Sequence, residues 1–205
     1  MIDNQDKITL SKVGSMRVIT GSARGKNLET LKGDEVVRPT AERVKEALFS
    51  AVQFHIPGAQ TLDLFAGSGQ LGIEALSRGA AMCVFIDQSR DACDVVKRNL
   101  KHTELYQNAR VASSDALIYL KYCKDKFDII FVDPPYKNGT VQNLLPELGR
   151  VCAQDGFVVC ETERDADLPD TSNNLTLKKS YRYGHTRIWL YQNASIASQD
   201  EGDKS

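Results

Sequence analysis

The sequence predicts an α/β fold, in which a largely parallel sheet carries helices on both faces. Three observations predict it. Short apolar segments alternate with amphipathic segments between residues 60 and 192, a glycine-rich loop follows the first apolar segment, and four of these segments end at or just before an aspartate. The 205 residues are enough for one such domain and too few for two large ones.

The elements follow in order along the chain. Residues 16–21 (MRVITG) alternate in polarity and predict a strand, and the basic residues after them predict a turn. A helix is expected over residues 40–54, because Thr40 can cap it and Val44 and Leu48 share one face. The rest of the chain predicts strands at 61–65, 81–87, 109–115, 127–133, 156–162 and 187–192, and helices at 72–80, 89–103, 116–123 and 140–152.

The chain ends and the cysteines indicate the cellular compartment. Residues 1–15 and 194–205 are predicted to be a loose extension and a disordered acidic tail, which leaves residues 16–193 as the folded domain. No apolar run reaches the roughly 18 residues that span a bilayer, so a cytoplasmic protein is expected. The five cysteines show no C-x-x-C spacing, and Cys83 and Cys160 are predicted to be buried free thiols.

Charge is unevenly distributed, although the formal net charge is only −1. Residues 7–46 hold nine Lys and Arg against five Asp and Glu, a net charge of +4. A second basic cluster consists of Lys178, Lys179, Arg182 and Arg187. Each patch is either an ordinary solvated face or a contact surface for nucleic-acid phosphates.

The loop DLFAGSGQLG, residues 63–72, contains the G-x-G-x-x-G pattern of dinucleotide-binding proteins. In a nicotinamide-binding turn the pyrophosphate lies at the helix N-terminus. Here Asp63 precedes Gly67 by four residues, where its carboxylate would repel a pyrophosphate and attract an ammonium group. S-adenosylmethionine carries an ammonium and a sulfonium and has no phosphate. The loop therefore favours S-adenosylmethionine, the alternative being a glycine turn needed only for packing.

Two further aspartates follow predicted strands. Asp87 stands twenty residues after Gly67, a distance that suits an acid binding ribose hydroxyls, which both cofactor classes present. Its alternative role is to cap the helix that follows. Asp115 either accepts a hydrogen bond from the adenine amine or caps the next helix, and both roles are compatible.

The segment DPPY, residues 133–136, supplies the strongest chemical signal. Its two prolines have fixed φ and no backbone N–H, while the carbonyls beside them and the Asp133 carboxylate accept hydrogen bonds. Tyr136 adds a ring on which a base can stack. These acceptors suit a planar base with an exocyclic amine whose nitrogen attacks a methyl group. The alternative is a proline-rich surface turn.

These motifs resemble those of Rossmann-like class I methyltransferases that modify exocyclic amines. MRVITGSARGKNL, RPTAERVKEALFS, DLFAGSGQLGIEALSRGA and FVDPPY together resemble the RsmD family of bacterial rRNA methyltransferases, over about residues 16–192. The resemblance implies a mostly parallel seven-stranded sheet with an antiparallel last strand, and a small N-terminal β-hairpin within residues 16–39. It also implies methylation of N2 of guanine 966 in 16S rRNA, within the 30S subunit or a late assembly intermediate.

The motifs and the resemblance assign roles to named residues. The expected cofactor-binding residues are Asp63, Phe65, Ala66, Gly67, Ser68, Gly69, Asp87, Gln88, Asp115 and Ala116. The expected catalytic residues are Asp133, Pro134, Pro135 and Tyr136, and the resemblance adds Arg17, Arg24, Lys26, Arg38, Thr40 and Arg43 as RNA contacts. No metal is expected, and the protein is expected to act as a monomer.

Three alternative functions stay open at the level of the sequence. A methyltransferase acting on adenine N6 in RNA or DNA would use the same acceptors on a different base. A nicotinamide oxidoreductase would share the glycine pattern, although Asp63 argues against it. A non-catalytic RNA-binding assembly factor would keep the fold without the reaction.

Overall fold

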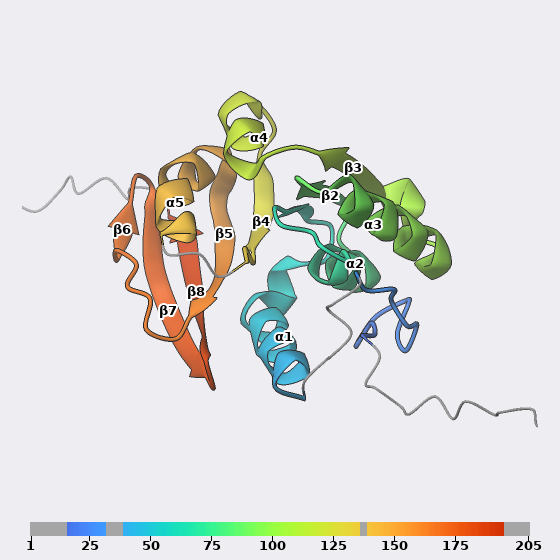
Figure 1. Ribbon diagram of the computed structural model, residues 1–205. Coiled ribbons are helices and arrows are strands. Elements are labelled where there is room, and N and C mark those ends of the chain that lie inside the picture. Colours follow the sequence, from blue (N-terminus) through green and yellow to red (C-terminus); the bar gives the residue numbers. More distant parts are fainter. Residues whose placement is uncertain (1–15, 32–38, 136–138, 195–205) are drawn as a thin grey trace, which may run out of the picture.

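The computed structural model describes residues 16–31, 39–135 and 139–194, with side chains from residue 43 onward in the first helix. It is built around one sheet flanked by helices (Figure 1). Within these ranges, no helix has both the length and the apolar character that a membrane span requires.

The described strands form a single eight-stranded sheet. They are β1 (Gln60–Asp63), β2 (Met82–Asp87), β3 (Ala109–Ser113), β4 (Phe127–Val132), β5 (Cys152–Glu163), β6 (Thr171–Ser172), β7 (Leu175–Tyr183) and β8 (Thr186–Asn193). Their spatial order is β3-β2-β1-β4-β5-β8-β7-β6. Pairing is parallel from β3 to β5 and antiparallel from β5 to β6. The carboxyl ends of β1 to β5 therefore lie at one edge of the sheet, called here the carboxyl edge.

The strand count differs from the seven that the resemblance implied. Strand β8 is antiparallel to β5 as expected, but the two-residue β6 adds an eighth strand by pairing Thr171 with Thr176. The polarity pattern also missed β7. Leu175 is the one buried residue of that strand, and its exposed Lys178, Lys179 and Arg182 give it the appearance of a solvated turn.

Residues 16–31, called here the N-terminal segment, form the expected small hairpin. An antiparallel bridge joins Arg17 and Asn27. Backbone hydrogen bonds run from the Val18 N–H to the Lys26 carbonyl and from the Leu28 N–H to the Met16 carbonyl, at 3.0 and 2.7 Å. The Glu74 carboxylate accepts hydrogen bonds from the backbone N–H groups of Ile19 and Thr20, at 2.7 and 2.9 Å, which attaches the hairpin to the helix that contains Glu74.

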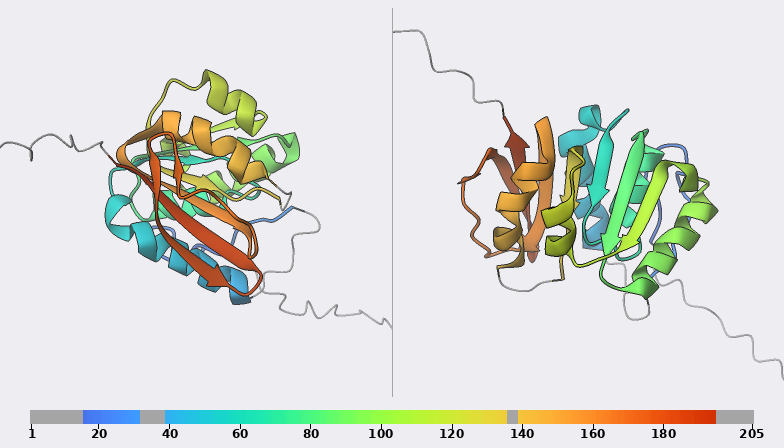
Figure 2. Two further views of the ribbon diagram at one scale, coloured as in Figure 1. Left: turned by 90° about the vertical axis from the view of Figure 1, so that its left-hand side faces the viewer. Right: turned by 90° about the horizontal axis from the view of Figure 1, so that it is seen from above.

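Helices cover both faces of the sheet, as predicted (Figure 2). They are α1 (Pro39–Val52), α2 (Gln70–Ser77), α3 (Arg90–Thr103), α4 (Ala116–Tyr122) and α5 (Thr140–Val151). Residues of α1, α2 and α3 pack in one apolar cluster with Phe131 and Val159, whereas α4 and α5 pack in a second cluster with Ile130 and Val158. All five cysteines are buried and free, which confirms the prediction for Cys83 and Cys160.

Candidate active site

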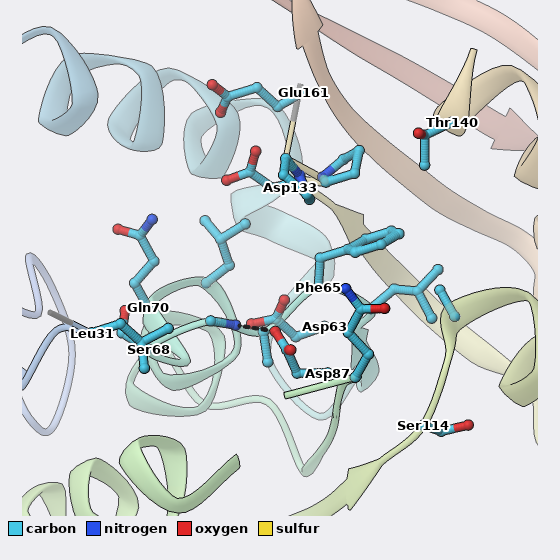
Figure 3. Close-up of a pocket in the computed structure, with 18 of the residues that line it drawn as sticks. Leu31, Asp63, Phe65, Ser68, Gln70, Asp87, Ser114, Asp133, Thr140 and Glu161 are labelled. Carbon is cyan, nitrogen blue, oxygen red and sulfur yellow. Dashed lines mark hydrogen bonds between the residues drawn. The ribbon is translucent and has the colours of Figure 1, made fainter. Parts of the chain in front are cut away.

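A cavity of about 670 Å³ lies at the carboxyl edge, within the usual size range for small-molecule sites (Figure 3). Its described lining contains carboxylates from four strands and the start of one helix, and no Lys, Arg or His. Such a lining repels a pyrophosphate and attracts a ligand with positively charged or hydrogen-bond-donating groups. The five acids are Asp63, Asp87, Asp115, Asp133 and Glu161.

Asp63 ends β1 and lies against the first turn of α2. It is 1% exposed, and its Oδ2 accepts a hydrogen bond from the Gly72 N–H at 2.9 Å. Burial raises the pKa of this carboxyl to about 7; the Gly72 hydrogen bond opposes the rise and the charge of Asp87 adds to it. Near neutral pH a bound cation would therefore shift Asp63 toward its charged form.

The glycines of the loop have separate structural reasons. Gly67 and Gly69 have φ values of +52° and +82°, in the left-handed region that side chains disfavour. A Cβ at Gly72 would lie 2.3 Å from the ring of Phe85 and 2.6 Å from Sγ of Cys83, so glycine allows α2 to pack closely on β2. Of these three glycines Gly67 lines the cavity, whereas Gly69 and Gly72 do not.

Asp87 ends β2 and holds the glycine loop in place. Its Oδ2 accepts a hydrogen bond from the Gly67 N–H at 2.9 Å (Figure 3). Its Oδ1 accepts one from the Ser89 N–H at 2.8 Å. The side chain that caps α3 belongs to Ser89, whose Oγ accepts from the Ala92 N–H. The alternative role of Asp87 as the cap of this helix is therefore wrong.

The position of Asp115 shows one of the two roles that the sequence left open and is compatible with the other. Asp115 caps α4, since its Oδ1 accepts a hydrogen bond from the Ile118 N–H at 3.0 Å, and it also borders the cavity. The other residues predicted for the cofactor that line the cavity are Phe65, Ala66, Gly67, Ser68, Gln88 and Ala116.

The residues after β4 form another part of the cavity wall. Asp133, Pro134 and Pro135 all line it, whereas Tyr136 lies outside the described residues. Burial raises the pKa of Asp133 well above its ordinary value, and the negative charges of Glu161 and Asp63 raise it further. A carboxyl with a raised pKa accepts a proton more readily than an ordinary one.

The structure adds lining residues that the sequence patterns did not single out. Glu161 comes from β5, and it follows the apolar run of its strand much as Asp133 follows β4. An acid directly after the apolar run of a strand could therefore have identified Glu161 from the sequence. Met16, Thr30 and Leu31 bring the two ends of the N-terminal segment to the cavity, and nothing in their local sequence indicates this.

Asn99 links the N-terminal segment to the glycine loop. Its Oδ1 accepts from the Glu29 N–H at 2.8 Å, and its Nδ2 donates to the carbonyls of Glu29 and Ser68 at 3.0 and 2.8 Å. The side chain is 1% exposed. Because three backbone groups share one buried amide, the cavity wall and the loop are held by the same side chain.

The candidate RNA contacts are spread over both edges of the sheet. Arg24 and Lys26 lie at the edge opposite the cavity: the Ser22 N–H donates to the carbonyl of Ser77 at the end of α2, and the Lys26 ammonium bonds Glu104, just beyond α3, at 2.8 Å. The ammonium of Lys26 is therefore already paired.

Arg43 lies closer to the cavity edge. The last residues of α1 lead into β1, so the helix begins at the carboxyl edge, and Arg43 is exposed in its early turns. Arg17 is exposed beside Asn27 in the N-terminal segment. Arg38 and the side chain of Thr40 lie outside the described residues.

The arrangement fits S-adenosylmethionine by its chemistry. The buried acid Asp63 can hold the ammonium group, Asp87 the ribose hydroxyls, and Asp115 with Ala116 the adenine, and all four residues line one cavity. In the described part of the chain, no group of three or more His, Cys, Asp or Glu side chains is placed to hold a metal ion.

The chain is similar to known methyltransferases over most of its length. The family model described as "Conserved hypothetical protein 95" matches residues 16–192. "Putative rRNA methyltransferase YlbH" of Bacillus subtilis (strain 168) is 41% identical over 182 residues, covering 86% of this chain and 98% of the relative. "Ribosomal RNA small subunit methyltransferase D" of Escherichia coli (strain K12) is 36% identical over 190 residues, covering 91% and 94%. The solved structure "Putative methyltransferase yhhF from Escherichia coli" matches with a TM-score of 0.76 at 36% identity, covering 87% of this chain and 98% of that one.

Proposed function

This chain belongs to the RsmD family of bacterial rRNA methyltransferases, and from that premise we propose that it methylates the exocyclic N2 amine of a guanine in 16S rRNA. The methyl donor is S-adenosylmethionine. The observation that carries the proposal is that Asp133 and Pro134 line the same cavity as Asp63, Asp87 and Asp115. Acceptors for an amine thus lie in one space with the acids suited to the donor.

When bound, S-adenosylmethionine supplies an electrophilic methyl group. The residues of the chain position and stabilise the amine that attacks it. The Asp133 carboxylate and the carbonyl of Pro134 accept the two N2 hydrogens, which orients the nitrogen lone pair toward the donor. As positive charge develops on the nitrogen, the Asp133 carboxylate and the Pro134 carbonyl stabilise it. The raised pKa of Asp133 then suits it to take up the proton that the methylated amine releases.

The proposed partner is 16S rRNA in the 30S subunit or a late assembly intermediate, with the protein acting in the cytoplasm as a monomer. The name of the Escherichia coli relative, which specifies the small ribosomal subunit, supports this choice of RNA. A base can reach the half-buried Asp133 when it is turned out of its stack, as in other enzymes that modify bases.

Replacing Asp133 tests the proposal. Asp133→Ala removes an acceptor for the reacting amine, and we expect kcat for subunit methylation to fall by on the order of 10²-fold, as for other preorganised polar groups. Binding of S-adenosylhomocysteine should change little, because the acids of the donor site remain. The assay uses small subunits from a strain that lacks the enzyme, with the methylated nucleoside identified by mass spectrometry.

A matched control is Asp125→Ala, which removes an exposed acid beside the start of β4, at the edge opposite the cavity. It should leave the rate unchanged. Three results would contradict the proposal: N6-methyladenine as the product, no product at all, or a near wild-type rate for Asp133→Ala. The first supports the adenine enzyme, and the second supports an assembly factor without activity.

A further inference from the structure

The cavity has a second acid beside the proposed catalytic one. In the parallel pairing of β4 and β5, Val132 lies opposite Cys160, and Asp133 and Glu161 are the residues that follow this pair. Side chains alternate between faces along a strand, so Asp133 and Glu161 emerge on the same face as Phe131 and Val159. Figure 3 shows the two carboxylates near each other, and both line the cavity.

Strand β8 orients Glu161. The Oγ1 of Thr186 donates a hydrogen bond to Glu161 Oε1 at 3.3 Å, and the antiparallel register pairs Glu161 with Ile188. A carboxylate offers about four acceptor positions on its two oxygens, so it can accept from Thr186 and also from a ligand. A hydrogen bond from β8 thus orients the Glu161 side chain, and the side chain itself lines the cavity.

Two carboxylates side by side suit a ligand that has two adjacent N–H donors. Guanine has this arrangement, because the N1–H lies next to the N2 amine. Adenine does not, because the ring nitrogen beside its N6 amine carries a lone pair and no hydrogen. A carboxylate beside the amine site therefore attracts guanine and repels adenine.

We propose that Glu161 accepts a hydrogen bond from the N1–H of the target guanine while Asp133 holds the N2 amine, which makes Glu161 the residue that selects guanine over adenine. The inference rests on the proposed function, since it assigns the base selectivity of that same site.

The test uses a base analogue that lacks only part of the guanine edge. The 2-aminopurine base keeps the amine but has a lone pair at N1 in place of N1–H, and no O6. Reconstituted small subunits carry either guanine or 2-aminopurine at the nucleotide that the wild-type protein methylates. We expect the wild-type protein to methylate guanine at least about 100-fold faster in kcat/KM, because sites built to bind an N–H reject analogues that lack it.

Glu161→Gln should reduce this preference to below about tenfold, because an amide can turn its NH₂ toward the N1 lone pair of 2-aminopurine. The loss of O6 affects both proteins equally, so it cancels in the comparison of the two ratios. Affinity of the two kinds of subunit for the protein saturated with S-adenosylhomocysteine gives a second readout that needs no reaction. The amide oxygen can still accept from Thr186, so the variant should fold.

Glu163→Gln is the matched control, because it makes the same change two residues further along β5 at an exposed position that does not line this cavity. It should keep the wild-type ratio. If Glu161→Gln and Glu161→Ala both keep that ratio while the product remains N2-methylguanine, the inference is wrong and the proposed function stands. If the wild-type protein makes no N2-methylguanine, both are wrong.

Discussion

At the scale of single residues, acids that line the cavity also stabilise the fold. Asp63 accepts from the backbone of α2, and Asp115 caps α4, yet both line the cavity. Burial makes Asp63 costly to ionise without a ligand. The titratable groups that interact electrostatically with Asp63 are Asp87, Asp133 and the Cys83 thiol. None of these three groups can carry a positive charge.

Cofactor affinity should therefore depend on pH through Asp63. Its folded pKa of about 7 is raised above the unfolded value of about 4, so the protonated form contributes stability below pH 4 that is lost as pH rises through 7. A cationic ligand needs the ionised form. We expect the Kd for S-adenosylhomocysteine, measured by calorimetry, to rise by up to about tenfold per pH unit below 7 and to level off above it.

Asp63→Asn isolates this effect. It can still accept from the Gly72 N–H, so the fold should persist, while binding weakens and its pH dependence between 6 and 8 flattens. Without ligand at pH 8, the variant should be more stable to heat than the wild-type protein, because no buried charge remains at this position. An unchanged pH profile in the variant would exclude Asp63 as the titrating group.

At the scale of elements, the N-terminal segment is attached by buried side chains of two helices. Glu74 of α2 is fully buried, accepts from two backbone groups of the segment, and forms ion pairs with Lys45 at 3.4 Å and Arg78 at 2.8 Å. Asn99 of α3 holds the other end of the segment. Because Met16 and Leu31 line the cavity, this attachment also determines one cavity wall.

Asn99→Ala should loosen the wall and the glycine loop together. The change leaves the Glu29 N–H and the carbonyls of Glu29 and Ser68 without this partner, and we expect a loss of about 1–3 kcal/mol in the free energy of unfolding. Hydrogen exchange should accelerate at residues 28–31, and S-adenosylhomocysteine should bind more weakly.

Arg98→Ala is the matched control for this prediction. It removes an ion pair with Glu29 at 2.8 Å between the same two segments, but both side chains are more than half exposed. Exposed pairs contribute little, so stability should fall by less than about 1 kcal/mol and cofactor binding should not change. Equal effects of the two variants would show that the buried amide has no special part in holding the loop.

At the scale of the whole molecule, basic residues near each other in sequence lie at different distances from the site. Arg24 and Lys26 lie at the edge opposite the cavity, and Arg43 lies toward the cavity edge. A base inserted at Asp133 brings its own phosphates close to the carboxyl edge. The geometry therefore favours Arg43 over Arg24 and Lys26 as a contact for the backbone around the target nucleotide.

Arg43→Gln should weaken binding to the small subunit and reduce its dependence on salt. Loss of one phosphate contact lowers the slope of log K against log salt concentration by about one unit, without effect on cofactor affinity. Lys124→Gln provides the comparison, because it removes an exposed charge between α4 and β4, at the opposite edge. Equal slopes for the two variants would remove Arg43 from the interface.

Much of the fold and part of the site follow from local sequence. Periodicity and neighbours along the chain specify the alternation of strands and helices and the role of Asp115 as a helix cap. They also specify the acids at the ends of β1, β2 and β4. Strand β7 escaped this approach because its exposed lysines follow no clear alternation. The glycine pattern alone indicated a dinucleotide, and Asp63 before it was needed to indicate a ligand without phosphate.

The sequence by itself therefore determined the fold class, through the alternation of apolar and amphipathic segments along the chain. It also determined the glycine loop and the DPPY turn, because each is encoded within a few consecutive residues. Only the tertiary structure decided that Glu161 lies beside Asp133, that the N-terminal segment lines the cavity, and that Arg24 and Lys26 lie at the edge opposite it. The physical reason is that strand order, helix packing and burial depend on contacts between distant parts of the chain, which local patterns do not specify.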